Sequence, residues 1–180
     1  LQDDTLKHGP VRAIFTVNEE DGMSSMNMDA EHLAGDYLIN LDWEWLGSVC
    51  NSCAGGDYFN FSHKADWIVP PAGTTAMTIS FNNLLGGHSG VGINKGHANA
   101  LVSLATALTM LRQGGVEFYV STIVGGQAKN AIPAQATAVI AVQKADCDKA
   151  QGILAKFYSE FIDAFGPIEN SCVWTVRVED

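Results

Sequence analysis

The fold depends on residues 77–92, which read MTISFNNLLGGHSGVG. The first part of this stretch alternates, with Met77, Ile79 and Phe81 separated by polar residues. A period of two places the apolar side chains on one face of a strand, so a half-exposed strand is predicted here. The glycine-rich part that follows, LLGGHSGVG, predicts a turn in which the backbone takes conformations open to glycine.

Downstream of this turn the pattern changes to helical spacing. Apolar residues recur from Leu101 to Leu111 at that spacing, and Gly114–Gly115 stops the helix. Asp146 is the expected N-cap of a second amphipathic helix, which Gly166–Pro167 ends. Further strands are predicted at residues 116–123, 134–142 and 173–178. The resulting order, β-α-β-β-α-β, predicts a ferredoxin-like α+β domain with both helices on one face of an antiparallel sheet.

Upstream, two apolar segments are each followed by acidic residues. Residues 11–17 (VRAIFTV) and 37–41 (YLINL) are typical of strands buried on both faces of an α/β sheet. Open α/β sheets bind ligands at the carboxyl ends of their strands. The sequence therefore predicts two parts, an α/β part at residues 1–55 and the α+β domain at 56–180, with the Pro-containing segment 67–73 leading into its first strand.

Three carboxylates lie at the ends of these two predicted strands. Glu19 and Glu20 follow the first, and Asp42 follows the second. Neighbouring carboxylates repel one another, and a divalent cation offsets both this repulsion and the cost of burial. Since strand neighbours point to opposite sides, one glutamate can bind a metal while the other acts on a metal-bound water. The alternative is a solvated acidic turn, which these three residues by themselves favour.

Composition limits the partners. Hydrophobic residues make up 47% and charged residues 17%, which is typical of a globular chain. A formal net charge of −10 argues against nucleic acid or an anionic membrane, since both require clustered Lys and Arg. No apolar run approaches the roughly 18 residues of a membrane span, and the first residues lack the pattern of a secretory signal. Cys50 and Cys53 form a C-x-x-C, for which reduced thiols of a cytoplasmic protein are favoured over a redox pair.

Six short motifs occur in a fixed order along nearly the whole chain. They are FTVNEEDGM (15–23), YLINLDWE (37–44), CAGG (53–56), GGHSG (86–90), INKGHANA (93–100) and GGQAKNAIP (125–133). Together they resemble the aminoacyl-histidine dipeptidase family of dinuclear zinc metallopeptidases, also called Xaa-His, cytosolic non-specific or carnosinase-like dipeptidases. The resemblance implies that residues 1–55 belong to a zinc-peptidase catalytic domain and 56–180 to its lid, or dimerisation, domain.

The resemblance also implies a role for each matched residue. Glu19 would be the general base, while Glu20 and Asp42 would each bind one of two zinc ions, with cobalt or manganese as substitutes. His88 would stabilise the oxyanion, in several relatives from the other subunit of a homodimer. Asn130 would lie near the carboxylate of a dipeptide substrate. From the residues alone, a histidine in a polar loop is the favoured interpretation of His88, and Asn130 can be a turn residue before a strand.

Departures from the family pattern limit what this chain can do. No H-x-D motif occurs in it, and a metal-bridging aspartate and a last histidine ligand are expected before residue 1 and after residue 180. Trp43 and Trp45 stand in a run that is usually Ser-Glu-rich, and His97 and Lys129 stand where arginines are expected. The resemblance therefore implies an internal fragment that is inactive alone. The alternative is a non-enzymatic ferredoxin-like module that dimerises or binds a small ligand.

Overall fold

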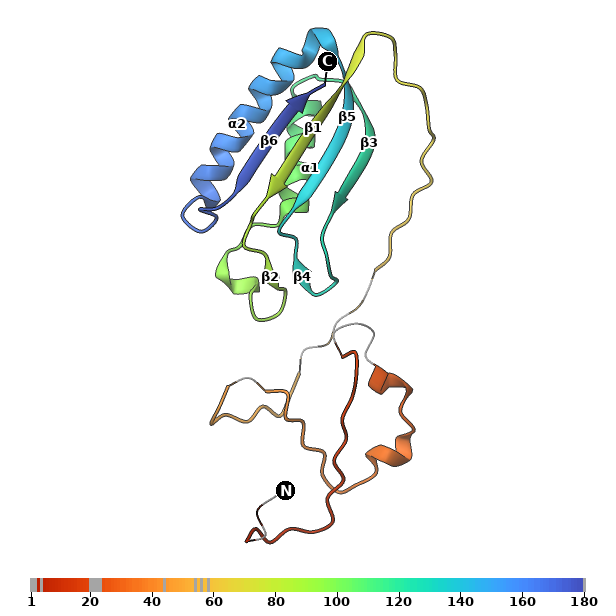
Figure 1. Cartoon of the computed structure of the whole chain (residues 1–180), viewed down its shortest axis with the longest axis vertical. Coiled ribbons are helices and arrows are strands. Elements are labelled where there is room, and N and C mark those ends of the chain that lie inside the picture. Colours follow the sequence, from red (N-terminus) through yellow and green to blue (C-terminus); the bar gives the residue numbers. More distant parts are fainter. Residues whose placement is uncertain are drawn as a thin grey trace. The chain divides into compact units, whose positions relative to one another are not determined.

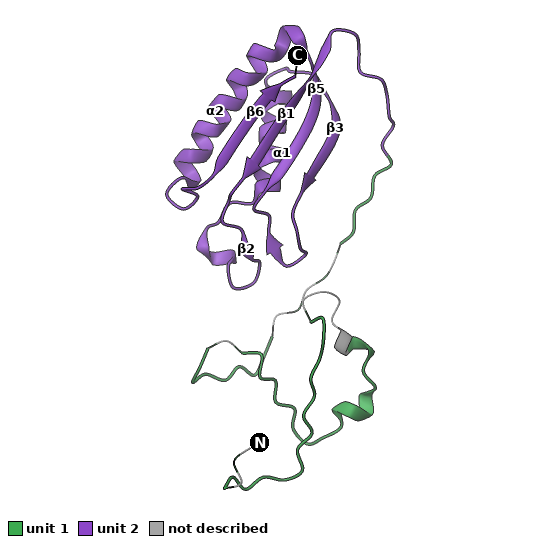
Figure 2. Ribbon diagram, viewed as in Figure 1, with its two compact units in different colours: residues 1–64 green, residues 65–180 purple. Residues whose placement is uncertain are grey.

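The structure is a computed structural model that describes residues 3, 5–19, 24–43, 45–53, 55, 57 and 59–179. The chain divides into two compact units, Leu1–Lys64 and Ala65–Asp180 (Figure 2). Within the described residues, no helix has both the length and the apolar character that a membrane span requires.

The second unit is built on a four-stranded sheet. Its strands are β1 (Thr74–Asn82), β3 (Phe118–Gly125), β5 (Ala136–Gln143) and β6 (Val173–Val178). They lie in the order β3-β5-β1-β6, and every neighbouring pair is antiparallel (Figure 1). In this order β1, the first strand of the unit, is central, and β3 and β6 form the two edges. This is the arrangement expected of a ferredoxin-like β-α-β-β-α-β chain.

Two helices cover one face of this sheet. The first is α1 (Ala100–Gln113) and the second is α2 (Cys147–Phe165). They contact each other, and α1 also contacts β1, β3 and β5 while α2 contacts β6 (Figure 1). The predicted antiparallel sheet with two helices on one face is therefore confirmed. Asp146 stands at the N-cap of α2 as predicted, but its side chain makes no capping hydrogen bond.

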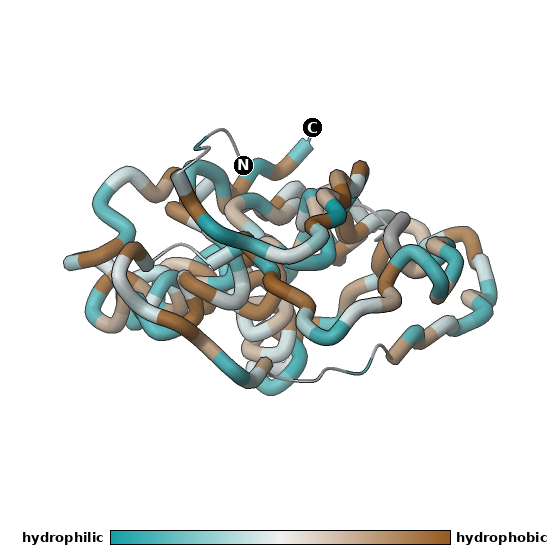
Figure 3. The backbone as a smooth tube through the Cα atoms, turned by 90° about the horizontal axis from the view of Figure 1, so that it is seen from below, coloured by the Kyte–Doolittle hydropathy of each residue, from teal (hydrophilic) through white to brown (hydrophobic). Residues whose placement is uncertain are grey.

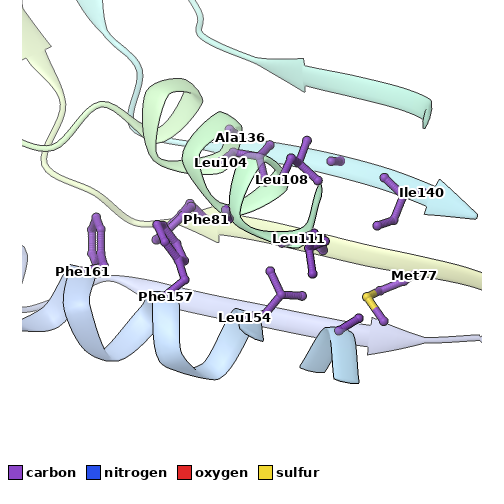
Figure 4. Packing of buried hydrophobic residues seen from close by; sticks show 14 of the residues in the cluster. Met77, Phe81, Leu104, Leu108, Leu111, Ala136, Ile140, Leu154, Phe157 and Phe161 are labelled. Carbon is purple, nitrogen blue, oxygen red and sulfur yellow. The ribbon is translucent and has the colours of Figure 1, made fainter. Parts of the chain in front are cut away.

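The core lies between the sheet and the two helices. Met77, Ile79 and Phe81 are fully buried and are paired in register with Ile140, Ala138 and Ala136 of β5. Leucines of α1 and the aromatic residues of α2 close over this face (Figure 4). The ring of Phe81 lies 4.8 Å from that of Phe161 and 4.5 Å from that of Trp174, centroid to centroid. Burial of this set is the main favourable term for the unit.

Short elements connect the main ones. A two-stranded sheet pairs β2 (Gly87–His88) with β4 (Ala131–Ile132), and three-residue 3-10 helices occur at Ile93–Lys95 (η3) and Lys144–Asp146 (η4). The β2–β4 pair brings the glycine-rich turn after β1 against the segment that precedes β5. The paired residues are 43 and 45 positions apart in the sequence, so the fold and not the local sequence makes these segments neighbours.

The first unit does not contain the strands that were predicted for it. Its described residues form two 3-10 helices, η1 (Ser24–Asn27) and η2 (Ala30–Leu33), and no strand. The segments 11–17 and 37–41 run without a ladder of hydrogen bonds, and Phe15 and Tyr37 are 91% and 92% exposed. Hydrophobic stretches do occur along the irregular backbone as well as in the helices and strands (Figure 3). A parallel strand needs neighbours on both sides and helices on both faces, and the described part of this unit supplies neither.

Candidate functional site

A glycine-rich loop between β1 and α1 carries the first predicted site residue. Gly86 has φ +60°, and a Cβ there would lie 2.9 Å from the carbonyl oxygen of Ile132. Gly87 has φ +124°, again in the region that side chains disfavour. The backbone can therefore turn tightly out of β1 and pair with β4 only because both positions are glycine.

His88 lies at the tip of this turn with an exposed side chain. Its Nδ1 accepts hydrogen bonds from the backbone N–H of Gly90, at 3.1 Å, and of Val91, at 3.4 Å. Because Nδ1 acts as an acceptor, the neutral ring carries its proton on Nε2. The loop thus presents the Nε2–H of the imidazole as a hydrogen-bond donor. That is the group required to stabilise an oxyanion.

The same loop fits closely around the imidazole. A Cβ at Gly90 would lie 3.2 Å from both Cε1 and Nδ1 of the ring, and one at Gly92 would lie 2.6 Å from the His88 carbonyl oxygen. That oxygen accepts a hydrogen bond from the N–H of Gly92 at 2.8 Å. Glycine at both positions therefore lets the chain fold back on His88 without a clash.

Asn130 lies beside His88. It is half-buried in a turn that precedes β4, and its carbonyl oxygen accepts a hydrogen bond of 2.7 Å from the N–H of Ser89. Lys129, the preceding residue, is exposed. The structure thus brings together two of the predicted site residues, His88 and Asn130, although their roles stay predictions.

Two further residues hold the loop. The Nδ1 of His97 is hydrogen-bonded to the carbonyl oxygen of Gly86, and a carbonyl oxygen can only accept, so His97 donates from this nitrogen. Glu169, just after α2, is 1% exposed and accepts hydrogen bonds from the N–H groups of Leu85 and Ala98, both at 2.8 Å. Sequence reasoning did not identify Glu169, because a single glutamate after Gly-Pro carries no pattern that marks it as buried.

The predicted catalytic carboxylates belong to the first unit. Glu19 and Asp42 are exposed, and Glu20 lies outside the described residues. Within the part of the chain that the structure describes, the group of metal-binding side chains that converges is Asp29, Glu31 and His32, whose ligand atoms lie within 4.8 Å of one another. All three are exposed, and this group includes none of the predicted ligands. The described residues therefore do not fit a dinuclear zinc site.

The four cysteines are free. Cys50 and Cys53 are exposed, and the thiol of Cys50 contacts the carbonyl oxygen of Ser52 rather than its C-x-x-C partner. In the second unit, burial raises the pKa of the Cys172 thiol, and the nearby charge of Glu169 raises it further. The structure is thus consistent with unpaired thiols and does not form a C-x-x-C disulfide.

The fold and the loop together define an α+β domain that presents a histidine from a glycine turn. Residues 79–168 match the family described as the peptidase dimerisation domain of the M20 peptidases, which amounts to half of the chain. The chain belongs to this family.

Two relatives match a longer part of the chain than residues 79–168. The cytosol non-specific dipeptidase of Escherichia coli (strain K12) is 33% identical over 163 residues, which cover 90% of this chain and 33% of that protein. The crystal structure of the aminoacylhistidine dipeptidase of Vibrio alginolyticus superposes with a TM-score of 0.55 at 25% identity, over 63% of this chain and 23% of that one. The chain thus spans about a third of the length of the curated relative and about a quarter of the solved one.

Proposed function

We propose that this chain contributes the dimerisation domain and part of the catalytic centre of a metal-dependent dipeptidase. The observation that carries the proposal is the 33% identity to a dipeptidase over 90% of the chain. The first unit makes up more than a third of the chain, so a match of that coverage includes most of it as well as the second unit. The likeness is therefore not limited to a domain that many peptidases share.

Each predicted residue has a role in this proposal. His88 donates from Nε2 to the oxyanion that forms at the scissile carbonyl, and Asn130, beside it, lies near the carboxylate of the dipeptide. Glu19 acts as the general base, and Glu20 and Asp42 are zinc ligands. The tautomer that the amides of Gly90 and Val91 impose on His88 supports the first of these roles.

The described residues do not form a complete metal centre. A catalytic zinc normally takes about three protein ligands and one open position, and the described residues do not gather such a set around Glu19 or Asp42. We infer that the other metal ligands belong to parts of a longer enzyme. These parts correspond to the regions of the relatives that this chain does not cover. The 180-residue chain alone is accordingly inactive, and the complete enzyme would use two zinc ions, or cobalt or manganese, in the cytoplasm.

A chimera tests the proposal directly. This chain replaces the matching third of the Escherichia coli dipeptidase, and dipeptide hydrolysis is measured with zinc, cobalt or manganese. Turnover by the chimera, its loss in Glu19→Gln with metal still bound, and no turnover by the isolated chain are the expected results. Robust hydrolysis by the isolated chain, or near-normal turnover in the Glu19→Gln chimera, would contradict the assigned roles. A folded, metal-loaded but inactive chimera would favour the non-enzymatic module instead.

A second copy of the chain is the proposed partner, and one side of the second unit suits it. Edge strand β3 (FYVSTIVG) has no charged residue. Its residues from Val120 to Gly125 are exposed, since β3 has a neighbouring strand, β5, on one side only. The adjacent helix α1 is uncharged from Ala100 to Leu111, and its exposed residues there include Val102, which is 62% exposed. An uncharged edge strand readily pairs with another strand, so natural proteins usually protect it.

The opposite side of the same unit is protected in this way. Edge strand β6 carries Arg177, and the exposed side of α2 bears Lys156 and Glu160, which form an ion pair at 3.8 Å. The surface formed by β3 and the exposed residues of α1 from Ala100 to Leu111 (the β3–α1 surface) carries no charge, although Arg112, the next residue of α1, is exposed and lies over the Phe118 ring of β3 at 5.8 Å. We infer from this difference in charge between the two sides that the β3–α1 surface is the interface. Two copies paired antiparallel through β3 would join their sheets and pack their α1 helices side by side.

A further inference from the structure

Glu169 is a buried carboxylate whose two oxygens bind different parts of one loop. Its Oε2 accepts from the N–H of Leu85 and its Oε1 from the N–H of Ala98, both at 2.8 Å. Leu85 follows β1 and Ala98 precedes α1, so the two amides mark the beginning and the end of the His88 loop (residues 85–98). A single side chain from beyond α2 therefore fixes both ends of this loop.

A carboxylate is the side chain that this position requires. Burying a charge is costly unless it is hydrogen-bonded, and here each oxygen receives an N–H. No described side chain has a buried nitrogen or oxygen without a partner, so the site is fully satisfied. A glutamine of the same shape has one acceptor oxygen, and its NH₂ group would face an N–H donor. The two-acceptor requirement therefore distinguishes a specific clamp from a side chain that merely fills space.

The inner contacts of the loop depend on this outer one. His97, next to Ala98, donates a hydrogen bond to the carbonyl oxygen of Gly86, next to Leu85, so the two ends of the loop meet a second time. Beyond that pair the chain closes on His88 through the N–H groups of Gly90, Val91 and Gly92. If the two ends of the loop separate, the N–H groups that bind His88 are no longer held in position.

We propose that Glu169 is a positioning residue for His88, since it holds the 85–98 loop in the shape that fixes the imidazole and its tautomer. Glu169 contacts the loop at the N–H groups of Leu85 and Ala98 and acts on His88 through the backbone. The catalytic consequence rests on the proposed function of His88, whereas the positioning itself does not.

The test uses the 180-residue chain and NMR, with no enzyme assay. Amide hydrogen exchange is measured at Leu85 and Ala98, with the amides of Ile79 and Ile140 in the sheet as references, and the ¹⁵N shifts of the His88 ring report its tautomer. In Glu169→Gln, exchange at the two loop amides should rise at least about tenfold relative to the sheet, and the His88 signals should move toward a mixture of tautomers. The matched control is Glu160→Gln, the same chemical change at an exposed position of α2, which should alter neither readout.

Other outcomes decide the matter the opposite way. Equal acceleration at loop and sheet amides, or an unchanged His88 tautomer, would mean that Glu169 only stabilises the fold. Should Glu169→Gln fail to fold, hydrogen exchange in the wild-type chain still tests whether Glu169 binds the two amides. The N–H groups of Leu85 and Ala98 exchange slowly if Glu169 holds them, and at the rate of an unstructured peptide if it does not. An inactive chimera together with a positive exchange result would reject the proposed function and leave the positioning role intact.

Discussion

The β3–α1 surface makes a quantitative prediction for the variant Ile123→Lys. Ile123 is 50% exposed on the edge strand, and it faces the helix side of the sheet, because it pairs with the buried Ala138. Fully burying an isoleucine side chain is worth about 1.5–3 kcal/mol, so covering the exposed half contributes about 1 kcal/mol. A twofold interface counts each contact twice, which gives about 2 kcal/mol, or roughly 30-fold in Kd.

That figure is a lower bound for the substitution. The substitution would also bring two lysines into the interface, where each ammonium loses water. The folded monomer should tolerate the change, since a half-exposed position lets the lysine reach solvent. We therefore expect a dimer at least about 30-fold weaker, with a melting temperature of the monomer close to that of the wild type.

Sedimentation velocity over a concentration series measures the dissociation constant. The matched control is Val173→Lys, a lysine at a position 45% exposed on the other edge strand, β6. This control should leave the dimer unchanged. An unaltered dissociation constant in Ile123→Lys, or a loss of dimer in Val173→Lys, would refute the assignment of the interface to the β3–α1 surface. A wild-type chain that stays monomeric would refute the proposal that this chain dimerises.

Two further predictions concern the second unit. A Cβ at Gly152, inside α2, meets nothing within 4 Å, so Gly152→Ala should raise the free energy of unfolding by about 0.5–1 kcal/mol. In Gly92→Ala the new Cβ would lie 2.6 Å from the His88 carbonyl oxygen, so this variant should lower the free energy of unfolding by about 1–3 kcal/mol. Urea unfolding monitored by circular dichroism measures both variants against the wild type. Burial raises the pKa of the Cys172 thiol in the folded chain, so the thiol of the unfolded chain ionises first as the pH rises. The free energy of unfolding should therefore fall above a pH of about 8.5, and this contribution should vanish in Cys172→Ala. A Cys172→Ala variant whose stability falls with pH as steeply as that of the wild type would contradict this prediction.

The fold of the second unit was predictable because its signals are local and agree with one another. The alternation at Met77, Ile79 and Phe81 corresponds to the buried face of β1, and the helical spacing from Leu101 to Leu111 corresponds to the face of α1 that meets the sheet. Gly114–Gly115 and Gly166–Pro167 end the helices where expected. Strand boundaries shifted by about two residues at β3 and β5, since the ladder of the neighbours, and not the apolar run, sets where pairing begins.

The first unit was not predictable in the same way. The apolar runs at 11–17 and 37–41 resemble buried parallel strands, yet such strands are defined by what lies around them. A run such as VRAIFTV can be a strand only when other strands bind its backbone and helices cover its two faces. Among the described residues of this unit no element does so, and Phe15 and Tyr37 are exposed to solvent. The apolar composition of these segments therefore indicated that they can form buried strands. Whether they do so depends on neighbouring strands and covering helices.

The His88 loop separates the two kinds of information most clearly. Its glycines are visible in the sequence because each meets a steric need at its own position, as at Gly86, where φ is +60°. The carboxylate that holds the loop is not visible, because Glu169 is 71 residues from Ala98 and 84 from Leu85, and the contact exists only once α2 has packed on the sheet. A residue that acts on a distant backbone leaves no motif beside the histidine that it serves. Its identity follows from burial together with two hydrogen bonds, which is why a positioning residue such as Glu169 has to be found in the structure, while the histidine can be found in the sequence.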